Sequence, residues 1–109
     1  MSRDFLGEFE HLLLLAILHL EPKAYGAALR RALRERAGRT ASLGAIYATV
    51  RRLVEKRLVV TEDVPSPKGG RPRRLARVTP AGLEALRRTR EATAGMEAGL
   101  EDRLGASRV

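Results

Sequence analysis

The chain has 109 residues and a mass of 12.0 kDa, which suits a single domain and leaves no room for a separate ligand-binding domain. Hydrophobic residues make up 44% and aromatic residues only 4%, so we expect a folded protein with an aliphatic core. Lys and Arg outnumber Asp and Glu by 21 to 13, a net charge of +8, which favours an anionic partner such as nucleic acid or a membrane surface.

The residue inventory excludes several classes of protein. The absence of cysteine excludes a disulfide scaffold, a Cys-ligated zinc site and a thiol nucleophile. The longest apolar run, residues 12–18, is far shorter than the roughly 20 residues of a membrane span. We expect no signal peptide at residues 1–4, because no basic region there leads into an apolar stretch with a cleavage site. We therefore expect a cytoplasmic protein without a membrane span.

The positive charge is concentrated in two blocks. Residues 29–57 carry a net charge of +7, residues 65–90 carry another +7, and the three remaining segments are net acidic. Arginines that only keep a small protein soluble need not be clustered along the sequence. The two blocks therefore favour a surface that binds a partner.

Two helices are predicted in the first third of the chain. Apolar side chains recur at helical spacing from Phe9 to Leu20, and Pro22 ends this first helix. The second helix begins near Tyr25, and Gly38 is its natural C-cap. The first helix is apolar nearly all round and must be covered on more than one face. We expect a second subunit to cover Leu14, Leu15 and Leu18.

The third predicted helix begins at Ser42, a favourable N-cap residue. Its buried stripe is predicted to comprise Leu43, Ile46, Val50, Leu53 and Val54. At about 100° per residue, its outward face is predicted to comprise Ala45, Ala48 and Arg52, flanked by Gly44, Thr49 and Arg51. Small residues permit close approach to another surface, and arginines reach guanine edges or phosphates. Tyr47 lies at the edge of the stripe, where an inward ring and a hydroxyl on a phosphate remain equally open.

A basic hairpin and a fourth helix follow. Residues 58–64 and 73–79 are predicted strands, and residues 65–72 form a loop rich in Pro and Gly that lacks the Lys-Ser/Thr of a P-loop. Thr79 caps the fourth helix with Pro80 at its first position, and a thin apolar stripe extends to Leu104 although Gly95 and Gly99 weaken it. This order predicts a mainly α fold with a small β-hairpin, a winged helix-turn-helix with a C-terminal dimerisation helix. We divide it into residues 1–79, which bind DNA, and residues 80–109, which dimerise.

Several short motifs, in their order and spacing, resemble the PadR-like transcriptional regulators. They are Leu6-Gly7-Glu8-Phe9-Glu10, the run of residues 12–18, Ala24-Tyr25-Gly26, Ser42-Leu43-Gly44-Ala45-Ile46-Tyr47, Arg52-Leu53-Val54-Glu55-Lys56, Gly69-Gly70-Arg71-Pro72 and Val78-Thr79-Pro80-Ala81-Gly82. The resemblance covers about residues 6–86. It implies a bacterial dimeric repressor that binds palindromic operator DNA and in which the first and last helices build the dimer.

The chain departs from this family's pattern at three places. Arg57 stands where the family usually has Gly, so a left-handed backbone there would strain it. Leu75-Ala76 replaces an aromatic pair of the second hairpin strand, which weakens the packing of the hairpin. The tail lacks the Trp of drug-binding relatives, so an aromatic small-molecule pocket is not carried over, and whether an effector exists stays open.

The sequence therefore predicts two contact surfaces and no catalytic residue, metal or cofactor. We expect double-stranded DNA to contact Ser42, Gly44, Ala45, Tyr47, Ala48, Thr49, Arg51 and Arg52 of the third helix and Lys68, Arg71, Arg73 and Arg74 of the hairpin tip. We expect the homodimer interface to use Leu14, Leu15, Leu18, Met96, Leu100 and Leu104. The alternative function is a winged-helix module that binds protein, whose contacts would not weaken steeply with salt as phosphate contacts do.

Overall fold

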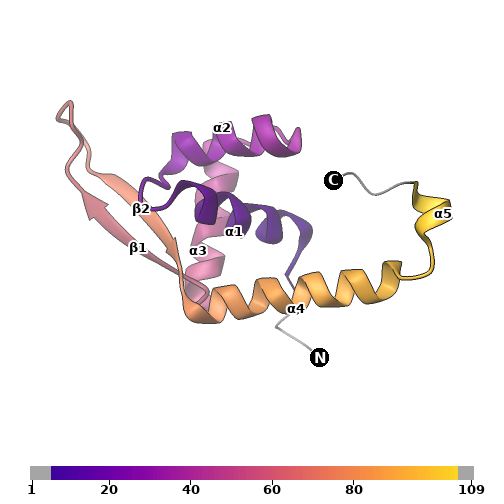
Figure 1. Ribbon diagram of the computed structural model, residues 1–109. Helices are drawn as coiled ribbons and strands as arrows, with labels where there is room; N and C mark the ends of the chain where they lie inside the picture. Colours follow the sequence, from indigo (N-terminus) through magenta and orange to yellow (C-terminus); the bar gives the residue numbers. More distant parts are fainter. Residues whose placement is uncertain (1–5, 106–109) are drawn as a thin grey trace.

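Three helices, a two-stranded hairpin and two further helices succeed one another along residues 6–105, the part of the chain that the computed structural model describes (Figure 1). The elements are α1 (Glu8–Leu20), α2 (Gly26–Ala37), α3 (Leu43–Glu55), β1 (Val59–Val64), β2 (Arg73–Val78), α4 (Pro80–Glu97) and α5 (Glu101–Leu104). The predicted order of elements is thus confirmed. The four residues on which the signal-peptide argument depended lie outside the described range.

The helix ends lie at the predicted capping residues. Gly38 follows α2 in the left-handed conformation, with φ +63°. The Oγ of Ser42 accepts a hydrogen bond from the amide of Ala45 at 3.0 Å, and this fixes the start of α3. The Oγ1 of Thr79 accepts a hydrogen bond from the amide of Gly82 at 3.0 Å and caps α4 in the same way.

The core is aliphatic, as the composition predicts, and α1 passes through its centre. Its buried residues come from every element except α5, with the largest contributions from α1, α2 and α3. Leu14 was expected at a subunit interface, but it is 0% exposed inside this core. The prediction is wrong because three elements of the same chain, α2, α3 and β2, already pack against α1. Leu15 is only half-buried and Leu18 is exposed, so the surplus apolar surface of α1 is smaller than the sequence suggests.

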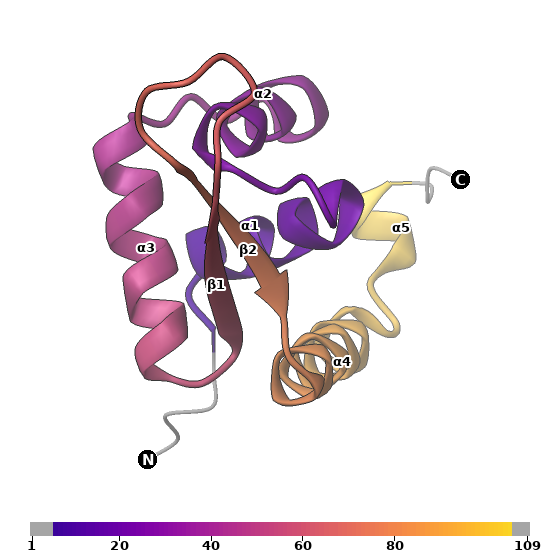
Figure 2. The same cartoon turned by 90° about the vertical axis from the view of Figure 1, so that its left-hand side faces the viewer.

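The hairpin is attached to the helical core through β2. The two strands are antiparallel, with Val59 opposite Val78 and Asp63 opposite Arg74. The amide of Ala76 donates a hydrogen bond to the carbonyl of Ala24 at 2.9 Å, outside the hairpin. Ala76 is itself buried, so the small residue in place of an aromatic one lets β2 lie close to the helices. In Figure 2 the loop of the hairpin lies in front of the first turn of α2, and Figure 1 shows that it projects beyond the helices at one end of the molecule.

The corner between α3 and β1 has a left-handed residue at the position where the resembled family usually has glycine. Arg57 has φ +64° and is the one non-glycine residue with a positive φ among residues 6–105. The hydroxyl of Thr79 donates a hydrogen bond to the carbonyl of Arg57 at 2.9 Å, which ties this corner to the start of α4. A left-handed arginine costs about 1–2 kcal/mol relative to glycine.

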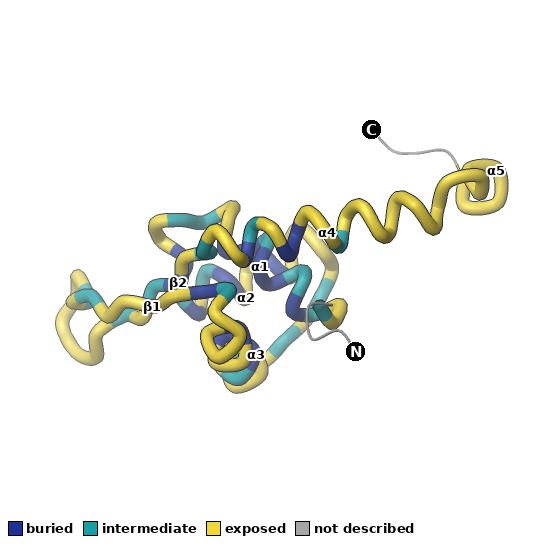
Figure 3. Tube along the Cα trace, turned by 90° about the horizontal axis from the view of Figure 1, so that it is seen from below, coloured by how far each residue is buried: buried dark blue, intermediate teal, exposed yellow. Residues whose placement is uncertain are grey.

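The second half of α4 and α5 extends away from the core (Figure 3). The principal extents are 53 × 30 × 21 Å, and the radius of gyration is 15.5 Å against about 13 Å for a compact domain of this size. Ala85 and Leu86 of α4 are buried, whereas Met96 is 78% exposed. The predicted stripe to Leu104 is interrupted, because α4 ends at Glu97 and Gly99 has φ +90°. No helix among the described residues is long and apolar enough to cross a membrane.

Candidate nucleic-acid interface

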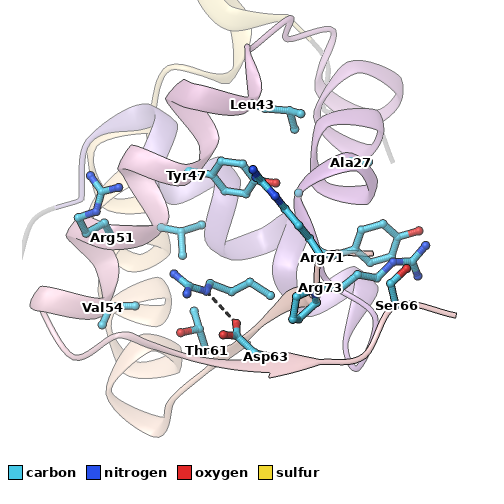
Figure 4. A pocket seen from close by; sticks show the side chains of 15 residues that line it. Ala27, Leu43, Tyr47, Arg51, Val54, Thr61, Asp63, Ser66, Arg71 and Arg73 are labelled. Atoms are coloured by element: carbon cyan, nitrogen blue, oxygen red, sulfur yellow. Dashed lines mark hydrogen bonds and ion pairs between the residues drawn. The ribbon is translucent and has the colours of Figure 1, made fainter. Parts of the chain in front are cut away.

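A groove of about 860 Å³ lies between α3, the start of α2 and the hairpin. Figure 4 shows Tyr47 and Arg51 of α3 on one side, Ala27 of α2 on another, and Arg71 and Arg73 of the hairpin closing the third. Arginines from both basic blocks of the sequence line this groove: Arg51 comes from residues 29–57, and Arg71, Arg73 and Arg74 come from residues 65–90. Such a concentration of arginines at a concave surface attracts an anionic partner.

The exposed face of α3 is rotated from the predicted one, and Thr49 shows why. Thr49 was expected on the outward face but is only 2% exposed. Its hydroxyl donates a hydrogen bond to the carbonyl of Ala45 at 2.9 Å, so the polar atom is satisfied within the helix and the residue can be buried. Val54 was expected in the core and is exposed instead, while Ala48 is half-buried. The outward face of α3 therefore centres on Gly44, Ala48 and Arg51 rather than on Ala48 and Arg52, with Ala45 still exposed beside it.

Arg52 belongs to an ion-pair network with α1. Its Nε lies 3.8 Å from Oε2 of Glu10, and one of its terminal nitrogens donates a hydrogen bond to Oγ1 of Thr49 at 3.0 Å. The Nζ of Lys56 donates to both carboxylate oxygens of Glu10 at 2.9 Å each. Burial by itself would raise the pKa of Glu10, but the hydrogen bonds from Lys56 and Gly7 and the nearby cations outweigh it and lower the pKa below its ordinary value. Arg52 is thus partly neutralised by its own chain.

The four cations predicted at the hairpin tip fall into two pairs. Lys68 and Arg71 are exposed on the loop. Arg73 is half-buried and stacks over the ring of Tyr25, with its guanidinium carbon 4.2 Å from the ring centroid. Arg74 donates a hydrogen bond from Nε to the carboxylate of Asp63 at 3.0 Å, which raises the pKa of Arg74 further. Among residues 6–105, Lys68 and Arg71 have no ion-pair partner, whereas Arg73 and Arg74 also hold the hairpin in place.

Tyr47 lies across the start of α2. This arrangement is intermediate between the two that the sequence left open, a ring packed inward and a hydroxyl on a phosphate. A Cβ added to Gly26 would lie 2.8 Å from Cζ and 2.9 Å from Cε1 of Tyr47, so glycine is what permits this contact. Tyr47 as a whole is nevertheless 46% exposed and lines the groove. Part of this residue is therefore accessible to a partner, while its ring packs against the start of α2.

The sequence reasoning missed Tyr25 and Asp63, which position the hairpin arginines. A signal for Asp63 existed, since antiparallel pairing of the two predicted strands places it opposite Arg74. Tyr25 gave no such signal, because its contact with Arg73 joins two elements that lie far apart in the chain. Within residues 6–105, no three acidic or histidine residues come together in a way that could hold a metal ion.

Three helices packed around one core, the third exposed beside a basic hairpin, define a winged helix-turn-helix protein. Residues 14–88 match the model of the transcriptional regulator PadR-like family. The chain belongs to the PadR-like family of transcriptional regulators. It is therefore a DNA-binding regulator rather than an enzyme, as the motif resemblance implies.

Solved structures show the same fold. A PadR family transcription regulator from Clostridium difficile R20291 is 22% identical, with a TM-score of 0.72 over 91% of this chain and 100% of that one. A PadR family transcriptional regulator from Eggerthella lenta DSM 2243 is 26% identical, with a TM-score of 0.69 over 92% and 88% of the two chains. A PadR-like transcriptional regulator from Bacillus cereus strain ATCC 14579 is 22% identical, with a TM-score of 0.70 over 91% and 93%. No curated protein matches the chain.

Proposed function

We propose that the protein is a homodimeric repressor that binds a palindromic operator, with α3 in the major groove and the hairpin on the neighbouring backbone. The observation that carries this proposal is the arginine-lined groove beside the exposed face of α3. Family membership supports DNA as the partner. Occupation of the operator by the dimer then blocks transcription.

The first turns of α3 are suited to approach base edges. Ser42 fixes the start of the helix, and Gly44 and Ala45 are exposed and too small to hold DNA away. Ala48 lies one turn further and offers a methyl group to a thymine methyl. We propose that Arg51, which is exposed at the groove, reaches a guanine or a phosphate, a role that the sequence pattern favoured for Arg52 on the predicted outward face.

The hairpin contributes affinity rather than base selection in this proposal. Lys68 and Arg71 are long exposed side chains on a loop that contains Gly69-Gly70, both with positive φ. Such side chains reach backbone phosphates or the minor groove more readily than they hold a fixed base edge. Arg73 adds positive charge from its position over Tyr25, whereas Asp63 offsets the charge of Arg74.

A second copy of the chain is the proposed cover for the projecting C-terminal segment. Met96, Leu100 and Leu104 are large apolar side chains exposed on α4, on α5 or between them. Leu15 and Leu18 expose apolar surface on α1, which contacts α4 within the chain. Large apolar side chains left exposed in this way favour an interaction site. The proposed dimer interface retains five of the six predicted residues and omits Leu14.

DNA binding is tested by a fluorescence anisotropy titration with mixed genomic fragments at two salt concentrations. We expect affinity to fall steeply with salt, because bound phosphates release counterions. The variant Lys68→Gln/Arg71→Gln should reduce the salt slope by about 1.8 per protomer and weaken binding to all fragments alike. The variant Arg90→Gln/Arg103→Gln removes the same charge from the C-terminal segment and should leave the slope unchanged. A salt-independent affinity would support the alternative, a module that binds protein.

The dimer is tested by analytical ultracentrifugation at micromolar concentration. We expect a particle of twice 12.0 kDa. The variant Met96→Lys/Leu104→Lys places charges in the proposed interface and should give a folded monomer with weakened operator binding. A folded wild-type monomer at this concentration would refute the dimer and the palindromic operator together.

A further inference from the structure

The outward face of α2 carries a stripe of arginines that the proposed function does not use. Arg30, Arg31 and Arg34 are all exposed, and we refer to these three residues as the arginine stripe. They follow Ala27 at spacings of three, four and seven residues, which places all four on one side of the helix. The opposite side of α2 is buried in the core through Leu29, Ala32 and Leu33.

No ion pair among the described residues accounts for the arginine stripe. Among residues 6–105, no ion pair includes any of its three members, whereas arginines elsewhere pair with Glu8, Glu10, Asp63 and Glu84. Arg30 and Arg34 are four residues apart, a spacing at which like charges destabilise a helix. The helix dipole favours Arg34 in the last turn but not Arg30 and Arg31 in the middle. The arginine stripe therefore has the properties expected of a surface that binds an external anion.

The arginine stripe continues the positive surface of the groove. Gly26 and Ala27 line the groove at the start of α2, and no later residue of the helix does so. From there α2 runs away from the hairpin (Figure 1). The seven residues from Ala27 to Arg34 span about 10 Å. That length corresponds to about three phosphates of one DNA strand, at 3.4 Å of axis each.

We propose that the arginine stripe binds backbone phosphates of DNA that flanks the operator half-site. This inference rests on the proposed function, because it extends the path of a strand already held between α3 and the hairpin. It predicts that the protein covers more DNA than its base contacts require. It also predicts that this additional contact is independent of sequence, since phosphates carry no base information.

The test compares one binding site in two lengths. Wild-type protein first selects a core of about 20 base pairs, two helical turns, from a random pool. The core is then prepared alone and with about 10 base pairs of random sequence, one helical turn, on each side. Affinity and salt slope are measured on both duplexes for the full chain and three variants. The variants are Arg31→Gln/Arg34→Gln, Arg31→Lys/Arg34→Lys and the control Arg90→Gln/Arg103→Gln.

We expect the flanks to increase both the affinity and the salt slope of the wild-type protein. The glutamine variant of the stripe should equal wild type on the short duplex and lose the gain on the long one. Its salt slope there should fall by about 3.6, for the four arginines of a dimer. The lysine variant keeps the charge and should keep the gain. The control should behave as wild type, and all four proteins should melt within a few degrees of one another.

Four results would overturn the inference. The first is that the flanks change neither the affinity nor the salt slope of the wild-type protein, and the second is that the glutamine variant loses equal affinity on both duplexes. The third is that the control variant loses as much affinity as the glutamine variant. The fourth is that the glutamine variant loses binding to phosphatidylglycerol vesicles while its DNA binding is unchanged. Failure of the pool to yield an enriched core would refute the proposed sequence-specific function instead. The salt slopes on random duplexes of about 40 base pairs, four helical turns, then decide the inference, because the glutamine variant must fall below the control.

Discussion

Replacing Gly82 with alanine should destabilise the protein, although alanine is the better helix former. A Cβ at this position would overlap the carbonyl oxygen of Leu58 and lie 2.7 Å from Cγ1 of Val78. The same carbonyl accepts a hydrogen bond from the amide of Thr79 at 3.0 Å, so it cannot retreat freely. Overpacking costs about 1–3 kcal/mol and strain in that hydrogen bond about 1 kcal/mol, against a gain in helix propensity of about 1 kcal/mol. The net loss is about 1–3 kcal/mol.

The matched control is the same substitution further along α4. Gly95 has nothing within 4 Å of an added Cβ, so Gly95→Ala should stabilise the helix by up to about 1 kcal/mol. Thermal unfolding followed by circular dichroism, at one protein concentration, should show a lower Tm for Gly82→Ala and a higher one for Gly95→Ala. Each kcal/mol corresponds to about 4–8 °C for a domain of this size. A rise in Tm for Gly82→Ala would refute the close packing of α4 on the α3–β1 corner.

Three further predictions concern strain, charge and DNA contact. Arg57→Gly should raise the free energy of unfolding in urea by up to about 1 kcal/mol, whereas Arg57→Ala, which keeps the left-handed penalty, should not. Because the pKa of Glu10 is lowered in the folded state, its stabilisation is complete above the unfolded pKa of about 4.3 and is lost as the pH falls through the lower folded value. The urea midpoint of Glu10→Gln should therefore depend less on pH below about pH 5 than that of wild type, and an unchanged dependence would contradict the network with Lys56. Ala48→Glu should abolish operator binding in an anisotropy assay with a Tm within a few degrees of wild type, and undiminished affinity would remove α3 from the interface.

The limits of the helices and the existence of the hairpin are local properties that the sequence could predict. Ser42 and Thr79 cap helices because a side-chain oxygen two or three residues from an unpaired amide is the nearest acceptor in any fold. Gly38 ends α2 because glycine adopts the left-handed conformation without strain. These helix ends depend on a few neighbouring residues, so they form in the same way whichever fold the rest of the chain adopts.

The direction in which each helix turns its side chains was decided only by tertiary packing. Thr49 is buried and Val54 exposed because the hydroxyl is satisfied inside α3, which allows the helix to rotate on the core. Arg52 forms an ion pair with Glu10, which lies 42 positions earlier in the chain, and no local sequence pattern specifies that pair. The sequence by itself determined a winged-helix order of elements and two basic blocks, since helix periodicity and turn residues act over short distances. Tertiary structure decided which of the described cations pair with acidic groups, because charges pair across elements that only the folded chain brings together.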